Sequence, residues 1–92
     1  MTHHSSSLTG WDPTEKTIHR TFRTGSFDRG VQFINAIAKL ATAADHHPDI
    51  LLTHAAVIVT LMTHDVGMVT AKDLALAKQI NQLWDTKYRP TA

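Results

Sequence analysis

Three histidines are the side chains best suited to chemistry in this sequence. His46 and His47 are adjacent and precede Pro48, and His64 follows later in the chain. An imidazole gains or loses a proton near neutral pH, so several imidazoles that converge can act as general acids and bases. Such a group could process a small molecule without a nucleophile or a bound cofactor.

Two other interpretations of these histidines remain open. Histidines at a helix end can interact with exposed carbonyl groups and the helix dipole, which requires no substrate. Three neutral imidazoles could also bind zinc. However, adjacent residues rarely direct both rings at one ion, and no Asp or Glu stands four residues from these histidines as a further ligand. We therefore expect no metal, and the absence of cysteine excludes disulfides, thiolate nucleophiles and Cys-containing zinc sites.

Length and composition indicate one globular domain. The chain has 92 residues, of which 42% are hydrophobic and 18% charged. We predict a disordered segment over residues 1–9, a single domain over residues 10–88 and a short tail over residues 89–92. His3 and His4 lie in the polar first segment and are excluded from the site. A core this small favours association, so a homodimer or homotetramer is expected.

Charge and hydropathy exclude two classes of partner. Lys and Arg number 9 against 8 Asp and Glu, which gives a net charge of +1. No helix or loop concentrates the basic residues, so we expect no direct binding to nucleic acid. The longest apolar stretch is far shorter than the ~20 residues that span a bilayer, and no signal-like segment begins the sequence. We therefore expect a soluble cytoplasmic protein without membrane contact.

The segments that must position these histidines alternate in type. Residues 10–24 have the pattern of a hairpin, residues 26–45 that of a helix, residues 50–63 that of a second hairpin, and residues 71–87 that of a last helix. Pro48 cannot continue the first helix, so the histidine pair falls at a helix-to-strand corner. The order β-β-α-β-β-α predicts an α+β fold, a four-stranded antiparallel sheet with helices packed on one face.

Local signals indicate the ends and faces of these elements. Ser26 can cap the first helix, and Thr70 with Asp73 has the spacing of a capping box at the last one. In the second hairpin, strand alternation puts Thr63 on one face and His64, at the far end of the last strand, on the other. The first helix has a broad apolar face made of Val31, Ile34, Ala38 and Ala41, flanked by Phe33, Ile37 and Leu40.

Several separated motifs resemble those of a known family. Residues 43–83 contain His-His-Pro, a later Thr-His, a glycine-containing turn with threonine, and an aspartate that opens the last helix. This arrangement resembles the signature region of the pterin-4a-carbinolamine dehydratases. Upstream, Gly-Trp at residues 10–11 and Ile-x-Arg-x-Phe at residues 18–22 are similar to the same family. The resemblance therefore extends over nearly the whole predicted domain.

The resemblance implies an activity and a set of site residues. Members of this family dehydrate 4a-hydroxytetrahydropterin to the quinonoid dihydropterin, which recycles the cofactor of aromatic amino-acid hydroxylases. They need no metal or cofactor, and they form dimers that pair into tetramers. By motif position, His46 and His64 would be the acid/base pair, and His47 would mainly hold the pterin. The further substrate-binding positions that the resemblance implies are Trp11, Asp73 and His54. Two of them keep a structural interpretation, Asp73 as the cap of the last helix and Trp11 as a residue of the core or of the sheet edge.

The sequence departs from the family pattern near the predicted site. Thr42 stands where an acidic residue is usual, His54 where an aromatic residue is expected, and Met68 where a second glycine is common. A bulky Met68 could narrow the pocket, or strain the turn if a positive φ is required there. We expect the helix that many members place before Gly-Trp to be absent, because nine residues precede Gly10. These departures leave a second hypothesis open, a catalytically weakened dehydratase-like oligomer that acts as a protein-binding or assembly module.

Overall fold

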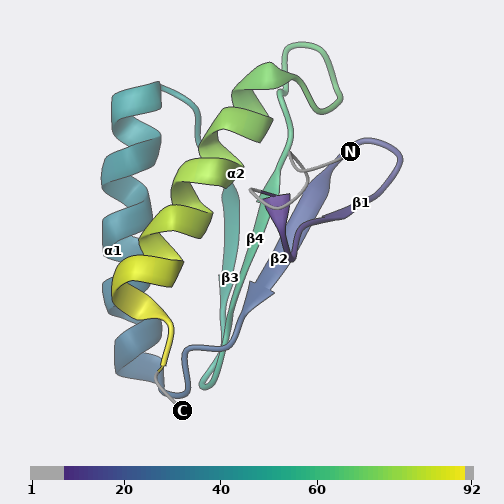
Figure 1. The fold of residues 1–92 in the computed structure, drawn as a ribbon. Helices are drawn as coiled ribbons and strands as arrows, with labels where there is room; N and C mark the ends of the chain where they lie inside the picture. Colours follow the sequence, from purple (N-terminus) through teal and green to yellow (C-terminus); the bar gives the residue numbers. More distant parts are fainter. Residues whose placement is uncertain (1–7, 91–92) are drawn as a thin grey trace.

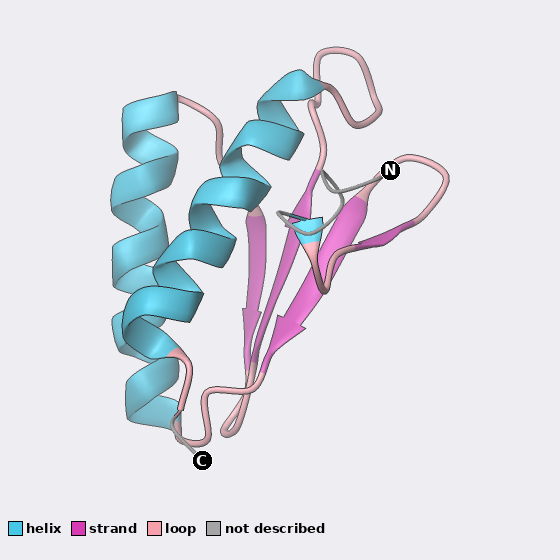
Figure 2. Cartoon of the chain, in the orientation of Figure 1, coloured by secondary structure: helices cyan, strands magenta, loops and turns pink. Residues whose placement is uncertain are grey.

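The sheet and the helices form two layers. In the computed structural model, which describes residues 8–90, both helices lie on one face of a four-stranded antiparallel sheet (Figure 1, Figure 2). The elements, in chain order, are β1 (Asp12–Pro13), β2 (Ile18–Phe22), α1 (Phe27–Ala44), β3 (Asp49–Leu52), β4 (Val57–Leu61), α2 (Ala71–Leu83) and a π-helical turn (Trp84–Tyr88). This confirms the predicted α+β fold and the order of its elements. Of the helices in this part of the chain, none is long and apolar enough to cross a membrane.

The strand order places the second hairpin beside the first. The sheet runs β1-β2-β4-β3, and every neighbouring pair is antiparallel. β2 and β4 form its centre and pair along their whole length, from Ile18 opposite Leu61 to Phe22 opposite Val57. Because strand side chains alternate between faces, Val57, Val59 and Leu61 all point toward the helices and are fully buried.

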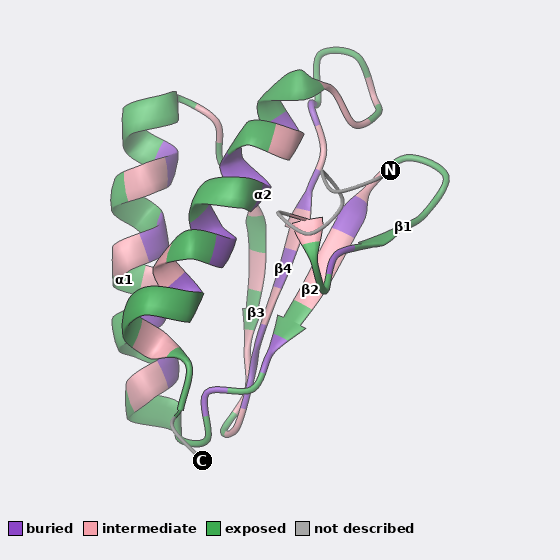
Figure 3. Ribbon diagram, in the orientation of Figure 1, coloured by how far each residue is buried: buried purple, intermediate pink, exposed green. Residues whose placement is uncertain are grey.

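Aromatic rings fill much of the space between the sheet and the helices. Phe22 of β2, Phe33 of α1 and Trp84 of the π-helical turn meet edge-on or tilted, with ring centroids 4.9–5.2 Å apart. In Figure 3 the buried residues lie on the sides of the two layers that face each other. Such ring pairs contribute about 0.5–1.5 kcal/mol each beyond the burial of their surface, so this cluster holds both helical segments on the sheet.

Only part of the broad apolar face of the first helix is buried. The buried residues of α1 are Gly30, Phe33, Ile37 and Ala41. Val31 is 38% exposed, and Ala38 is exposed as well. At Gly30 the helix lies so close to the sheet that a Cβ atom would come within 2.6 Å of Leu52 Cδ1. This close approach selects which stripe of the apolar face is buried and turns Val31 and Ala38 outward.

The second hairpin is shorter than predicted, and His64 does not lie on a strand. β4 ends at Leu61, and an isolated bridge between Thr63 and Met68 closes a turn that contains His64. Gly67 supplies the positive φ (76°) of this turn. Thr63 keeps the buried side that strand alternation predicts for it, while His64 is exposed.

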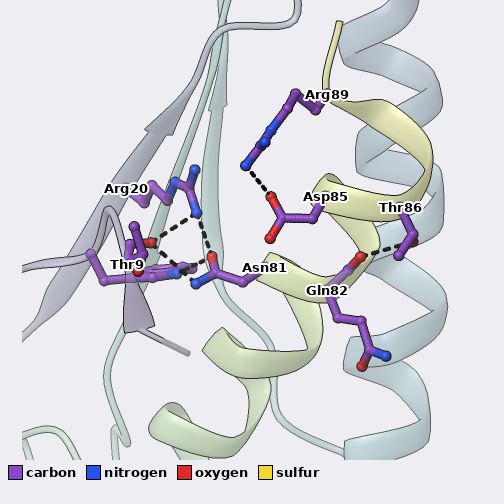
Figure 4. A network of polar contacts seen from close by, with 8 residues as sticks. Thr9, Arg20, Asn81, Gln82, Asp85, Thr86 and Arg89 are labelled. Atoms are coloured by element: carbon purple, nitrogen blue, oxygen red, sulfur yellow. Dashed lines mark hydrogen bonds and ion pairs between the residues drawn. The ribbon is translucent and has the colours of Figure 1, made fainter. Parts of the chain in front are cut away.

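The first described residues pack against the domain. Leu8 contacts the hydrophobic core, and the Thr9 carbonyl accepts hydrogen bonds from Arg20 Nη1 (2.9 Å) and Asn81 Nδ2 (3.1 Å), a convergence that Figure 4 shows. The rest of the segment predicted to be disordered, residues 1–7, lies outside the described residues. The predicted absence of a helix before Gly-Trp concerns the same residues.

Candidate active site

One end of the two-layer structure gathers the histidines. At this end α1 finishes, β3 begins, and the turn after β4 leads into α2 (Figure 1). These segments surround a pocket of about 290 Å³. Its lining residues are Asp45, His46, His47, Thr63, His64, Asp65 and Lys72. The three histidines that the sequence predicts to be catalytic therefore line one pocket.

The end of α1 positions the backbone of His46. Asp45 caps the helix in the left-handed conformation (φ 51°), which Asp tolerates better than most residues. The backbone N–H groups of Asp45 and His46 donate to the carbonyls of Thr42 (3.2 Å) and Ala41 (3.1 Å). Pro48 then prevents the helix from continuing. These backbone hydrogen bonds at the helix end fix the position of His46 and the direction in which its side chain points.

His46 is paired with a buried carboxylate. Its Nε2 atom lies 2.5 Å from Asp73 Oδ1, and the two side chains are 11% and 0% exposed. Asp73 Oδ2 accepts hydrogen bonds from Thr63 Oγ1 (2.7 Å) and from the Thr70 backbone N–H (2.9 Å). Because an ionised carboxylate only accepts, His46 Nε2 carries a proton, and Nδ1 is the ring nitrogen left to exchange a proton with a ligand.

The surroundings of Asp73 keep its carboxyl group ionised. Burial by itself raises the pKa of a carboxyl group. Here the hydrogen bonds from His46, Thr63 and Thr70, together with the charge of His46, outweigh burial and hold the pKa of Asp73 below its usual value. The site therefore has a fixed negative charge directly behind its most buried imidazole.

The same carboxylate caps α2. Thr63 Oγ1 gives its only hydrogen to Asp73, so Thr70 is the donor in the 2.6 Å contact between Thr63 Oγ1 and Thr70 Oγ1. Thr70 Oγ1 in turn accepts from the Lys72 backbone N–H (3.3 Å), and Asp73 completes the predicted capping box. The start of α2 and the orientation of His46 therefore depend on one buried side chain.

Acid is expected to destabilise the fold through Asp73. A group whose pKa is lowered by folding contributes stability above its unfolded pKa, about 3.9 for Asp, and this contribution is lost as the pH falls through the folded value. Between about pH 5 and pH 2, thermal unfolding should show a steeper loss of stability for the wild type than for Asp73→Asn, which has no carboxyl group to protonate. Equal pH slopes for the two proteins would contradict this link.

The other predicted site residues differ in where they lie. The His47 and His64 rings are exposed at the pocket, and in the described part of the chain neither makes a hydrogen bond. Trp11 is 9% exposed in the core, where its Nε1 donates to Asn81 Oδ1 (2.7 Å). His54 is exposed in the turn between β3 and β4, at the opposite end of these strands. Neither Trp11 nor His54 lines this pocket, and their substrate-binding roles stay predictions.

Two residues of the site, Thr63 and Lys72, were not predicted from the sequence to belong to it. Thr63 is buried and donates to Asp73, while Lys72 lines the pocket from the first turn of α2. A hydroxyl on an otherwise apolar strand face needs a buried partner, so the position of Thr63 could have been noticed. Lys72 has no comparable signal, because a lysine on a helix surface is ordinary.

The departures from the family pattern do not block the pocket. Met68 is 50% exposed, lies outside the pocket lining and has no positive φ, because Gly67 adopts that conformation. The narrowing or strain expected from Met68 is therefore not found. Thr42 lies exposed in the last turn of α1, and the carboxylate that contacts His46 comes instead from α2, as Asp73.

Known sequences match most of this chain. The family model described as "Pterin 4 alpha carbinolamine dehydratase" matches residues 1–83. A protein of Roseiflexus castenholzii, named "Putative pterin-4-alpha-carbinolamine dehydratase", is 43% identical over 76 residues, which cover 83% of this chain and 82% of that protein. A protein of Sulfurisphaera tokodaii with the same name is 38% identical over 76 residues, with the same coverage of 83% and 82%.

Several solved structures are similar to this one, and two of them are described here. A transcriptional coactivator/pterin dehydratase from Brucella melitensis has a TM-score of 0.77 and 29% sequence identity, over 90% of this chain and 96% of that one. A pterin dehydratase-like protein, described as a RuBisCO assembly factor in the alpha-carboxysome, has a TM-score of 0.64 and 22% identity, over 79% of this chain and 84% of that one. At this lower identity, the second likeness shows a shared fold alone.

Proposed function

This chain belongs to the pterin 4 alpha carbinolamine dehydratase family, and from this premise we propose that it dehydrates a 4a-hydroxytetrahydropterin, such as 4a-hydroxytetrahydrobiopterin, to the quinonoid dihydropterin. The observation that carries the proposal is one pocket lined by His46, His47 and His64, in which the buried Asp73 orients the first ring. Imidazoles in one pocket supply both a proton donor and a proton acceptor near neutral pH.

The reaction moves one proton to the substrate and one away from it. The bond between carbon 4a and the hydroxyl oxygen breaks, its electron pair leaves with the oxygen, and an acid protonates that oxygen so that water departs. A base takes the proton of the adjacent ring nitrogen, whose electron pair then forms the carbon–nitrogen double bond. No oxidant or reductant is consumed, so a general acid and a general base suffice.

Within this proposal, His46 is the base and His64 is the acid. Asp73 accepts the Nε2 proton of His46, which leaves Nδ1 to take the proton of the pterin ring nitrogen. The carboxylate then stabilises the imidazolium that forms. His64 is exposed at the same pocket and is available to protonate the leaving oxygen, and His47 would hold the pterin ring.

Asp73 acts through His46 in this mechanism. Its side chain is 0% exposed, so a pterin in the pocket does not reach it. Its proposed role is that of a positioning residue, which selects the tautomer of His46 and holds the ring in place. This refines the expectation that Asp73 binds the substrate.

Purified protein is expected to accelerate the loss of 4a-hydroxytetrahydropterin above the spontaneous rate. A positioned acid or base typically contributes about 10²–10⁴-fold, so the acceleration should be easily resolved. An aromatic amino-acid hydroxylase generates the carbinolamine in the assay, and absorbance follows its disappearance. A rate equal to that of buffer alone would reject the proposed activity.

An assembly or protein-binding module is the second candidate function. The observation that favours it is exposed apolar surface, with Phe27 52% and Val31 38% exposed on α1, and Leu51 58% exposed on β3. Association into a homodimer or homotetramer, or with another protein, would cover such side chains. The similar RuBisCO assembly factor supports this alternative by its fold alone. A module of this kind would keep its function after loss of His46 and His64, whereas the dehydratase would not.

A further inference from the structure

A second pocket lies at the end of the molecule opposite the histidines. It has a volume of about 430 Å³ and is lined by Arg29, Lys87, Arg89 and Pro90. Arg29 belongs to the first turn of α1, whose 18 residues extend for about 27 Å before they reach the histidine pocket (Figure 1). Three of the four lining residues are cations at neutral pH, and none is a carboxylate. The pocket is therefore electropositive and separate from the candidate active site.

Contacts between distant parts of the chain hold these cations in place. Arg29 Nη2 donates to the Tyr88 carbonyl (2.6 Å), which ties the start of α1 to the π-helical turn. The Arg89 backbone N–H donates to the Trp84 carbonyl (2.7 Å), which closes the end of that turn. Arg89 Nη2 also pairs with Asp85 Oδ1 (2.5 Å), the contact drawn in Figure 4. The guanidinium groups of the pocket are thus arranged before any ligand arrives.

One donor at this pocket lacks a partner. Arg29 Nε is shielded from solvent and has no hydrogen-bond partner in the described part of the chain. A buried donor on a charged group is costly to leave unpaired, so the structure shows one unsatisfied N–H on a guanidinium group that lines the pocket. Lys87, on the same pocket, forms no ion pair among the described residues. An oxyanion in the pocket would pair with the Lys87 ammonium and lie beside the positive charge of the Arg29 guanidinium group.

The charge of the pocket suits a phosphate group. Asp85 offsets one of the three positive charges, which leaves about two, and a phosphate monoester carries about −1.5 to −2 at neutral pH. Arginine side chains also match the geometry of phosphate oxygens by forming two parallel hydrogen bonds. We propose that the pocket formed by Arg29, Lys87 and Arg89 binds a phosphate group, carried either by a small soluble molecule or by a lipid headgroup.

Inorganic phosphate is the probe that tests this site. In a titration of ¹⁵N-labelled protein at constant ionic strength, the amide signals of Arg29, Lys87 and Arg89 should shift and saturate. Lys87→Gln should weaken phosphate binding about tenfold, the loss expected when one charge-assisted contact is removed. Lys78→Gln is the matched control, because Lys78 is an exposed lysine of α2 outside the pocket. This control should bind phosphate as the wild type does.

Three outcomes would overturn the site. In the first, chloride at equal ionic strength produces the same amide shifts as phosphate. In the second, Lys87→Gln and Lys78→Gln weaken phosphate binding equally. In the third, neither inorganic phosphate nor lipid vesicles bind. Thermal unfolding of Lys87→Gln checks that the variant is folded. The readout is binding, so the result is independent of whether the chain is a dehydratase.

Phosphatidylglycerol vesicles distinguish the two sources of the phosphate. Sedimentation of the wild type and of Lys78→Gln with vesicles, but not of Lys87→Gln, would place the phosphate on a lipid headgroup. Saturable binding of inorganic phosphate without sedimentation would place it on a small soluble molecule. Either result supports a phosphate site in this pocket.

Discussion

Replacing His64 with alanine is expected to lower kcat/KM for the dehydration by roughly 10²–10⁴-fold, the usual loss when a general acid is removed. His64 is exposed in the turn after β4 and makes no hydrogen bond in the described part of the chain, so its loss should leave the fold intact. Steady-state rates, together with thermal unfolding of the same preparation, measure the two effects separately.

The pH dependence of the rate identifies the role of His64. An acid and a base in one mechanism produce a bell-shaped profile, whose alkaline side reports loss of the proton from the acid. If His64 is that acid, the alkaline decline should disappear in His64→Ala, while the acidic side remains. An unchanged profile at a lower rate would mean that His64 has another role.

His19 offers the matched control for His64. It lies in β2 opposite Thr60, and since its neighbour Ile18 faces the core, His19 points to the sheet face that the helices leave open. His19→Ala removes the same ring from a position outside the pocket and should leave kcat/KM nearly unchanged. Equal losses in His19→Ala and His64→Ala would argue against a specific role of His64.

Asp73→Asn is expected to reduce activity strongly while it keeps the volume of the buried side chain. In the wild type, Oδ1 accepts from His46, and Oδ2 accepts from Thr63 and from the Thr70 backbone N–H. The amide of the variant has a single oxygen, which can accept from His46 or from Thr63 and Thr70, but not from both sides. If the oxygen remains with Thr63 and Thr70, the NH₂ group faces His46, and that ring can adapt by moving its proton from Nε2 to Nδ1. The nitrogen proposed as the base would then already carry a hydrogen.

The wrong tautomer should affect the rate more than the binding of substrate. We expect kcat to fall by about 10²–10⁴-fold, because loss of the orienting carboxylate can have an effect of this size in a site where an aspartate fixes the tautomer of a histidine. The ¹⁵N shifts of the His46 ring report its tautomer directly. Asp65→Asn is the matched control, since Asp65 is an exposed carboxylate that lines the pocket and forms no hydrogen bond or ion pair with His46 among the described residues. Similar losses in both variants would assign the effect to the charge of the pocket.

Asp73→Ala should instead be dominated by loss of stability. It leaves the donors of His46, Thr63 and Thr70 without their acceptor and opens a cavity in a side-chain position that is 0% exposed. Breaking a buried charged network in this way costs about 3–5 kcal/mol, a large share of the stability of a small domain. Activity measured in the alanine variant would therefore mix catalysis with unfolding, which makes asparagine the more informative substitution.

Much of the fold could be predicted because its signals act over a few residues. Ser26 caps α1, and Pro48 cannot be part of a longer helix. Thr70 and Asp73 form the capping box of α2, as their spacing indicates. Strand alternation likewise predicts that Val57 is buried on the helix side of β4. These features depend on backbone geometry within one element.

The precise ends and buried faces depended on packing between elements. The apolar pattern of α1 is wider than the stripe that the sheet can cover, and the close approach at Gly30 decides that Val31 is left outside. His64 lies in a turn because the bridge from Thr63 to Met68 ends the strand early. Neither result follows from the periodicity of the sequence. Periodicity predicts which side chains share a face of a helix or strand, but not which other element packs against that face.

By itself, the sequence determined the elements, their order and the three histidines that could exchange protons. Only the tertiary structure decided that Asp73, 27 residues away, contacts His46, and that Arg29 meets the Tyr88 carbonyl 59 residues along the chain. It also placed Trp11 in the core, away from the pocket. The physical reason is the range of the forces involved. A hydrogen bond requires atoms about 3 Å apart, and for residues on different elements that distance is set by how the helices and the sheet pack.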